Sequence, residues 1–369
     1  MRVLVAPDDY KDSMSALGAA RAIERGWLRT APHDFVDVCP MSDGGPGFVD
    51  VLHHSLGGEL LAATVTGPLG QPIPAAVLLV GQTAYVEAAH ACGLALLPPE
   101  KRDPTVTSTT GVGDLLLEAR DSGANKIVVG LGGTGTNDAG AGMLAALGAT
   151  ADVPLHRGGV ALREVTTVDL EPARRALASI ELVAATDADN PLLGLTGATK
   201  TYGPQKGASD EEVMSLEGAL AAFAAAVGRT ANGKDPAVAL GSGAAGGLGY
   251  ALLQLGAIRV SGFGVVRDAV KLTERISQCD VVVTGEGRFD WSSLRGKVCC
   301  GVAKAALEQA RPCVVLAGEA IVGQREYCAI GVTEAHSMID VAGSMEESMA
   351  DPETTLEALA AKIARVWSH

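Results

Sequence analysis

Short apolar runs alternate with polar, glycine-rich loops along this chain, and this alternation predicts an α/β fold. Residues 3–6, 35–39 and 127–129 are apolar runs of strand length, and each is followed by a polar loop. After the first loop, apolar residues recur at the helical period behind Ser15, a good N-cap. Strand, loop and helix in this order build an open sheet whose functional residues lie at the carboxyl ends of its strands.

The pattern changes near residue 60. Residues 64–66, 75–80 and 83–88 indicate strands joined by short turns, which predicts an antiparallel meander. Strand and helix alternation returns after residue 280. We therefore expect two α/β domains: a flavodoxin-like open sheet built from both chain ends (1–60 and 276–369), and an inserted mixed α/β domain (61–275). Helices are expected at 112–120, 210–227, 298–309 and from 353 onward.

Composition narrows the class of protein. The 369 residues are 47% hydrophobic with a net charge of -14, which argues against binding to nucleic acid or to anionic membranes. The N-terminus enters a strand without signal-peptide architecture, and no apolar stretch of membrane-spanning length occurs. The seven cysteines show no CxxC pair, so we expect reduced core residues in a cytoplasmic protein.

The loop that follows residues 127–129 is the most informative segment. It places Gly132 and Gly133 before Thr134, Thr136, Asn137 and Asp138, and then an apolar helical pattern opens at Gly140. Small residues let backbone N–H groups approach an anion, and a helix start favours negative charge. The alternative is a tight turn with a helix cap at Asn137 or Asp138.

Other polar groups follow other expected strands. Asp187, Asp189 and Asn190 close the strand expected at 181–186, either as ligands for Mg²⁺, as a base for a hydroxyl, or as an Asp-Asn-Pro turn. Further candidates at loops are Asp43 with Gly44 and Gly45, Lys206, Glu286, Arg288 and Lys297. Glycine loops, carboxylates and a few cations are what phosphoryl transfer needs.

A dinucleotide site is the alternative from the residues alone. The pattern G-x-G-x-x-G occurs at 130–135 and at 241–246, whereas no Walker A motif is present. The first match follows an expected strand, and Asp152 lies about 20 residues further on, as the fingerprint requires. Residues 149–151 are a poor second strand, which weakens the match.

Eight motifs in order give the chain a specific resemblance. They read APDDYKDS at 6–13, MSDGG at 41–45, TGPLG at 66–70, GGTGTNDAGAGM at 132–143, DADNPL at 187–192, YGPQKGA at 202–208, AAGGLG at 244–249 and TGEGRFD at 284–290. In this set the chain resembles the bacterial glycerate kinases of the type I family. It departs from the family pattern at Asp9, Asp12, Val112 and Trp291 and in Val298-Cys299-Cys300.

The resemblance implies phosphorylation of glycerate, or of a related hydroxy acid, by ATP and Mg²⁺ in the cleft between two domains. Asp187 and Asp189 would hold the metal or orient the hydroxyl, and Lys11, Arg288 and Lys297 would act with them. The substrate and phosphate ligands would be Asp8, Ser13, Asp43, Gly44, Gly45, Gly132, Gly133, Thr134, Thr136, Asn137, Asp138, Asn190, Lys206 and Glu286. An NAD(P)-dependent oxidoreductase and a non-catalytic sugar-acid-binding protein remain the alternatives, and the oligomeric state, a homo-oligomer included, is left open.

Overall fold

The computed structural model describes residues 1–230 and 232–368 and divides into two compact units. Unit 1 comprises Met1–Asp43, Asp50–Leu56 and Phe263–His369, and unit 2 comprises Gly44–Val49 and Gly57–Gly262. Residues 44–49 thus lie in unit 2, although the first domain was expected to include them. The last return of the chain to unit 1, at Phe263, lies earlier than the expected residue 276. The reason is the packing of α10 (Gly262–Ala269) and α11 (Leu272–Ser277) with the sheet formed by the chain ends, where Arg275 pairs with Asp37 at 3.0 Å.

Unit 1 is built on five parallel strands. Their order is β13 (Glu334–Ser337), β12 (Cys313–Ala320), β11 (Val281–Phe289), β1 (Arg2–Val5) and β2 (Phe35–Val38). Counted along the unit this is the order 2-1-3-4-5 of flavodoxin-like sheets. The strand order reverses between β1 and β11, so this is the point where such sheets place their ligands.

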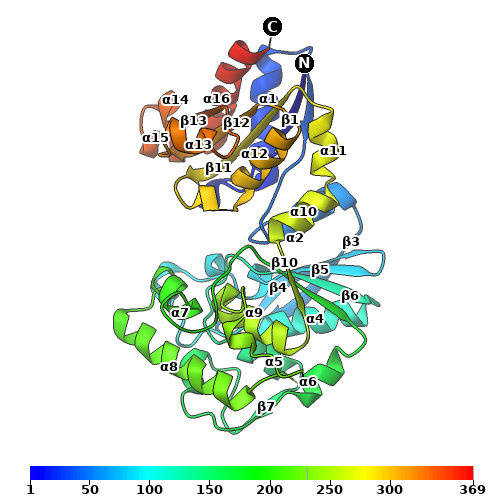
Figure 1. Cartoon of the computed structure of the whole chain (residues 1–369), viewed down its shortest axis with the longest axis vertical. Helices are drawn as coiled ribbons and strands as arrows, with labels where there is room; N and C mark the ends of the chain where they lie inside the picture. Colours follow the sequence, from blue (N-terminus) through cyan, green and yellow to red (C-terminus); the bar gives the residue numbers. More distant parts are fainter. Residues whose placement is uncertain (231, 369) are drawn as a thin grey trace. The chain divides into compact units, whose positions relative to one another are not determined.

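Helices cover both faces of this sheet. The helices α1 (Ala16–Thr30) and α16 (Pro352–Trp367) lie side by side on one face (Figure 1) and share a buried cluster with Val3 and Val281. Because neighbouring strand residues point to opposite faces, Leu4 and Val282 are buried on the other face, where α12 (Val298–Glu308) packs against β11 and β12. The remaining helices of unit 1 are α2 (Phe48–Leu56), α13 (Gln324–Cys328), α14 (Ile339–Ala342) and α15 (Met345–Ala350).

Unit 2 contains a mixed sheet of six strands. Their order is β10 (Ile258–Val260), β9 (Glu181–Ala185), β6 (Lys126–Gly130), β5 (Thr83–Glu87), β4 (Pro72–Val80) and β3 (Glu59–Thr66). The first four strands are parallel, and β3, β4 and β5 form the predicted antiparallel meander. The carboxyl ends of β5, β6, β9 and β10 therefore meet at one edge of the sheet.

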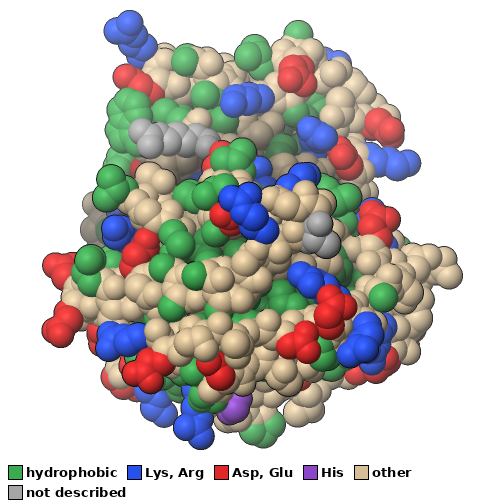
Figure 2. All heavy atoms as spheres, turned by 60° about the horizontal axis from the view of Figure 1, so that its bottom comes forward, with side chains coloured by type: hydrophobic (Ala, Val, Ile, Leu, Met, Phe, Trp, Pro, Cys, Tyr) green, Lys and Arg blue, Asp and Glu red, His purple; other side chains and the backbone are tan. Residues whose placement is uncertain are grey.

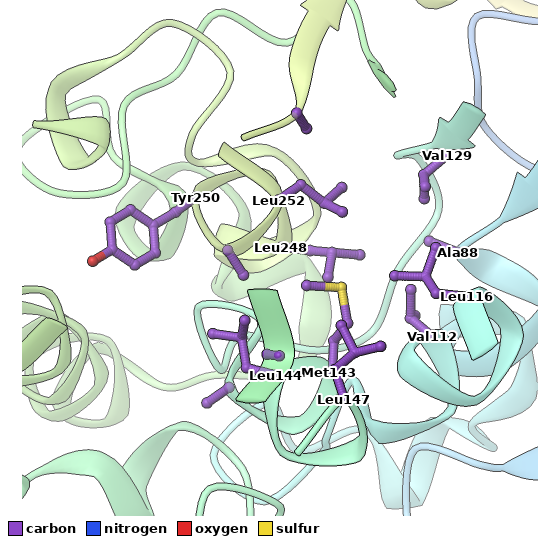
Figure 3. Close-up of a cluster of buried hydrophobic side chains, with 14 of the residues drawn as sticks. Ala88, Val112, Leu116, Val129, Met143, Leu144, Leu147, Leu248, Tyr250 and Leu252 are labelled. Atoms are coloured by element: carbon purple, nitrogen blue, oxygen red, sulfur yellow. The ribbon is translucent and has the colours of Figure 1, made fainter. Parts of the chain in front are cut away.

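The core of unit 2 lies between this sheet and three helices, α4 (Thr110–Asp121), α5 (Ala141–Ala146) and α9 (Ala244–Gln254). Met143 and Leu248 point toward each other in the middle of this cluster (Figure 3). The other elements of unit 2 are α3 (Ala89–Cys92), α6 (Glu171–Ala176), α7 (Ala198–Tyr202), α8 (Asp210–Val227) and the short pair β7 (Thr150–Ala151) and β8 (Val168–Asp169).

Two details differ from the expectations. The strand expected at 281–284 continues as β11 to Phe289, because its pairing with β12 persists to Phe289 and Ala320. Glu286 and Arg288 thus lie within a strand and not after it. Six cysteines are buried as expected, but Cys328 is exposed.

Lys and Arg side chains are interspersed with Asp and Glu over the face shown in Figure 2. Among the residues that the structure describes, no helix combines the length and the apolar character needed to cross a bilayer.

The contact between α1 and α16 gives the first prediction. A Cβ atom on Gly26 would lie 2.1 Å from the Glu357 carbonyl oxygen, so Gly26→Ala should destabilise unit 1 by roughly 1–3 kcal/mol, the cost of overpacking. Gly218 in α8 has open space at its Cβ position, and Gly218→Ala should instead stabilise by up to about 1 kcal/mol. Calorimetric unfolding of both variants measures this, and an unchanged Gly26→Ala protein would show that the helices are further apart.

Candidate active site

Carboxylates converge at the strand reversal of unit 1. Asp8 follows β1, and its backbone N–H donates to the Gly285 carbonyl oxygen of β11 at 2.8 Å. Burial raises the pKa of Asp8 well above its ordinary value, and the negative charges of Asp43, Asp9 and Glu286 raise that pKa further. Acidic groups that follow β2 and β1 or lie in β11 are therefore close together, and each disfavours the ionisation of the others.

A glycine in β11 makes room for this arrangement. A Cβ atom on Gly285 would lie 2.2 Å from the Tyr10 hydroxyl oxygen and 2.0 Å from the Leu316 carbonyl oxygen. The Tyr10 hydroxyl donates to that carbonyl, which anchors the loop after β1 to β12. The sequence analysis did not predict a role for Tyr10, and its position within the motif at 6–13 was the only signal.

Glu286 is the most buried of these acids. Its side chain is 6% exposed, and its Oε1 atom is buried with no hydrogen-bond partner among the described residues. Burial raises its pKa, while a hydrogen bond from Ser293 and the charge of Lys297 act in the opposite direction. An orphaned buried carboxylate oxygen is costly, which suggests that a ligand or water supplies its donor.

The predicted cations of unit 1 differ in availability. Lys11 is exposed, and the Lys297 ammonium donates to Ser292 Oγ at 2.9 Å. Arg288 already pairs with Glu319 at 3.3 Å and with Asp290 at 3.6 Å. Lys11 and Lys297 are therefore better candidates for pairing with an anionic ligand than Arg288, which is already paired with two carboxylates. The predicted ligand Ser13 donates its hydroxyl to the Tyr10 carbonyl oxygen at 2.6 Å.

In unit 2 the loop after β6 is packed backbone against backbone. A Cβ atom on Gly132 would lie 2.5 Å from the Gly45 Cα atom, and one on Gly133 would lie 2.5 Å from Pro46. Gly44 has a φ of +95°, and its Cβ would lie 2.9 Å from the Ala185 carbonyl oxygen. The two glycine loops that the sequence singled out thus meet at the carboxyl edge of this sheet.

Asp138 and Asn137 are completely buried and hold the loop in place. The Asp138 carboxylate accepts the N–H groups of Thr109, Gly140 and Gly142 at 2.9, 3.0 and 3.2 Å. It therefore occupies the start of α5 that the sequence suggested for an anion. The Asn137 amide donates to Thr199 Oγ1 at 2.9 Å, and its Oδ1 atom has no partner among the described residues.

Lys206 is a buried cation beneath this loop. Its side chain is 3% exposed, and its ammonium donates to the Thr136 carbonyl oxygen at 2.7 Å and to Thr134 Oγ1 at 3.5 Å. No carboxylate of the described residues forms an ion pair with it. Burial lowers its pKa to about 8. The charge of Asp138 acts in the opposite direction on this pKa. A desolvated ammonium that forms no ion pair is a candidate site for an anion.

A second glycine loop, which the sequence marked as a further G-x-G-x-x-G match at 241–246, packs against the first. Ala245, Gly246 and Gly247 all have positive φ values, and the Ala139 N–H donates to the Gly246 carbonyl oxygen at 3.0 Å. A Cβ atom on Gly246 would lie 2.0 Å from the Thr136 carbonyl oxygen, the acceptor of Lys206. Only the tertiary contact shows this role, because the two loops are far apart in the chain.

The polar residues of the loop after β9 differ in exposure and in their partners. Asp189 is exposed and pairs with Arg259 at 2.6 Å, whereas Asp187 is half-buried beside the end of the strand. Asn190 accepts the Tyr202 hydroxyl at 2.8 Å and donates to the Thr196 carbonyl oxygen at 2.7 Å, so it fastens the loop to α7. Among the described residues, no three His, Cys, Asp or Glu side chains are grouped to hold a metal ion.

A buried acid that the sequence did not single out also acts here. Glu87, at the end of β5, accepts the N–H groups of Gly47 and Val49 at 3.2 and 3.3 Å. It fixes the segment that carries Gly44 and Gly45 in unit 2. Its only signal in the sequence was an acid at the end of an apolar strand.

The geometry does not suit a dinucleotide. After the first G-x-G-x-x-G loop, α5 begins only at Ala141, and Asp138 already occupies its first N–H groups. Asp152 accepts N–H groups of Thr166 and Thr167 and does not follow a sheet strand of the required unit. The helix start that should bind pyrophosphate is therefore filled.

Comparisons with known proteins agree with each other. Residues 3–368 match the glycerate kinase family. A glycerate kinase of Halalkalibacterium halodurans is 40% identical over 99% of this chain and 98% of its own, and the glycerate 2-kinase of Escherichia coli is 39% identical over 94% and 93%. A crystal structure from Salmonella typhimurium LT2 that carries the name glycerate kinase 2 superposes with a TM-score of 0.80 at 35% identity, over 99% of this chain and 98% of that one.

The buried ammonium predicts a pH-dependent stability. The folded pKa of Lys206, about 8, lies below its ordinary 10.5, so the charged form costs stability below pH 8, and this cost disappears as the pH rises toward 10.5. Lys206→Met should therefore be most advantageous near pH 7. That advantage should shrink by on the order of 3 kcal/mol by pH 10.5, at 1.36 kcal/mol per pKa unit.

Denaturant unfolding at several pH values measures this difference. Lys101→Met, at an exposed position of the same unit, is the control and should show no such trend. A constant difference between wild type and Lys206→Met across this range would show that the ammonium is solvated.

Proposed function

This chain belongs to the glycerate kinase family, and from that premise we propose that it transfers the γ-phosphoryl group of ATP to a hydroxyl of glycerate. The observation that carries the mechanism is the set of mutually repelling acids at the strand reversal of unit 1. Phosphoryl transfer needs a carboxylate that orients the attacking hydroxyl and cations that meet the charge on the phosphates.

Asp8 is the base in this proposal. Its raised pKa, caused by burial and by Asp43, Asp9 and Glu286, brings its proton affinity closer to that of a group working near neutral pH. Its carboxylate accepts the hydroxyl proton as the glycerate oxygen bonds to the γ-phosphorus, and the bond from that phosphorus to the bridging oxygen breaks to release ADP. Lys297, beside Glu286, is placed to pair with the carboxylate of the hydroxy acid.

The loop of unit 2 supplies the phosphate contacts. Lys206 provides a positive charge that water does not screen, directly beneath Thr134 and Thr136. The carboxylate of Asp138 accepts the N–H groups of Thr109, Gly140 and Gly142, and we infer that the loop so fixed presents a rigid backbone to an anion. Rigid donors that need no reorganisation are what stabilise charge in a transition state.

Magnesium fits this donor set as a partner of the nucleotide. Mg²⁺ binds through one or two carboxylates plus substrate phosphates and does not need a complete protein cage. Asp187 is the better of the two predicted ligands, because Asp189 is exposed and paired with Arg259. When bound, the ion would neutralise negative charge on the phosphates.

The alternatives are weaker. The filled start of α5 disfavours an oxidoreductase, and relatives that align over nearly the whole chain are named glycerate kinases. The departures from the family pattern at Asp9 and Trp291 lie near Asp8 and Lys297, so a related hydroxy acid remains a candidate substrate. Seven unpaired cysteines support a location in the reducing cytoplasm.

The activity itself is the first test of this proposal. Purified protein with ATP, Mg²⁺ and D-glycerate should release ADP, and removal of Mg²⁺ with a chelator should stop the release. A coupled assay for ADP measures it, and absorbance of NAD(P)H in a parallel sample covers the oxidoreductase. No ADP from glycerate or from other short hydroxy acids would refute the kinase function.

The role of Asp8 has its own test. Asp8→Asn should lower kcat by about 10²-fold or more, whereas Asp50→Asn, at an exposed position of the same unit, should leave it unchanged. The base must be ionised, so kcat/KM should fall as the pH drops through the raised pKa of Asp8. Asp43→Asn removes a charge that raises this pKa and should move the acid limb to lower pH. An acid limb that stays in place would assign the base to another carboxylate.

A further inference from the structure

Unit 2 contains a cavity of about 800 Å³ that the proposed reaction does not use. It is lined by the end of α9, the residues that lead into β10, the start of α6 and the segment after α8. Ile258 is the first residue of β10 and Glu171 precedes β9, so the cavity lies at the amino-terminal edge of these parallel strands. Asp187 and the glycine loops lie at the opposite, carboxyl edge.

The lining combines an apolar wall with two cations, Arg174 and Lys234, and two carboxylates, Glu171 and Asp235. The apolar residues of the lining include Pro236, Ala239, Leu253, Leu255 and Ile258. Such walls with a few polar groups are typical of sites for small molecules, which commonly occupy 300–1,000 Å³ cavities, as a rough range.

The charged groups of the lining leave donors for an anion. One terminal nitrogen of Arg174 pairs with the Glu171 carboxylate at 2.9 Å, and its Nε atom donates to the Gln254 backbone carbonyl oxygen at 3.5 Å. The Asp235 carboxylate caps the N–H of Ala237 at 3.0 Å. Lys234 forms no ion pair with any described carboxylate. The remaining guanidinium nitrogen of Arg174 and the Lys234 ammonium can therefore meet an anion.

A buried acceptor adds a second, independent signal. Gln254 is 3% exposed, and its amide nitrogen donates to the Gly228 carbonyl oxygen at 2.8 Å and to the Tyr250 hydroxyl at 3.1 Å. Its Oε1 atom is buried and has no partner among the described residues. An orphaned carbonyl oxygen beside a cavity is matched by a ligand that carries an N–H or O–H group.

We propose that this cavity binds a small organic anion with an apolar body and one hydrogen-bond donor. The apolar body lies on Leu253 and Ile258, the anionic group meets Arg174 and Lys234, and the donor meets Gln254. The site is separate from the one that binds the substrates. Ala237, which lies between the lining residues Pro236 and Ala239, accepts the Leu192 N–H at 3.0 Å, and this bond connects the segment to the loop after β9.

The probe is 8-anilinonaphthalene-1-sulfonate, which has a sulfonate, an aromatic body and an anilino N–H. Its fluorescence should rise with one saturable phase on the full-length protein, and neither ATP nor glycerate should displace it. Arg174→Gln should weaken binding roughly 10-fold or more, as expected for a lost charge-assisted hydrogen bond. Arg175→Gln is the matched control, because it removes the same charge from an exposed neighbour on α6 that does not line the cavity.

A second variant keeps the test independent of Arg174. Ala239→Phe places a ring in the cavity and should abolish the saturable phase, with thermal unfolding by circular dichroism confirming that the protein is folded. If either variant unfolds, Lys234→Gln at an exposed position takes its place. Equal affinity in wild type and variants, displacement by ATP, or no saturable phase would each overturn this site. None of these outcomes bears on whether ADP is released from glycerate.

Discussion

Close packing of backbone against backbone at the ends of parallel strands is the constraint on which this structure depends. In unit 2 the carbonyl oxygen of Thr136 lies where a side chain on Gly246 would be, and it still accepts the ammonium of Lys206. In unit 1, Gly285 has no side chain, and this leaves room for the Tyr10 hydroxyl to donate to the Leu316 carbonyl oxygen of β12. Glycine is required at these points because any Cβ atom would collide with main-chain atoms that cannot move independently.

This packing has an electrostatic consequence. It removes water from ionisable groups, so Asp8 and Glu286 become weaker acids and Lys206 becomes a weaker base. All three shifts bring the groups closer to neutrality than they would be in water, which costs stability when the ligands are absent. Functional sites commonly carry such unfavourable charges because a bound anion or a transferred proton relieves them.

The two orphaned oxygens at the predicted sites illustrate the same principle. Glu286 Oε1 and Asn137 Oδ1 are buried without partners among the described residues, although most buried polar atoms in proteins are satisfied. Gln254 Oε1 in the cavity of unit 2 is a third case. Where the surrounding network is otherwise complete, an unpaired acceptor indicates the place where a ligand completes it.

Much of the fold followed from the sequence, because local patterns decide local structure. The period of apolar residues placed α1 behind its Ser15 cap and predicted a helix at 210–227, where the structure has α8. The short turns after residue 60 gave the antiparallel meander. The glycine loops and their acids marked the carboxyl ends of strands in both sheets, and the ordered motifs indicated the family.

Only the tertiary structure decided which polar residues are available for chemistry. Asp138 and Asn190 looked like ligands in the sequence, yet their side chains are taken up by neighbouring N–H and hydroxyl groups. Asp189 is similarly tied to Arg259, 70 residues further on. Lys206, in contrast, is buried by long-range packing, and no described carboxylate forms an ion pair with it, which makes it a candidate for binding an anion. The sequence fixes which groups a loop carries, but their partners come from distant segments, and burial and pairing set their charge.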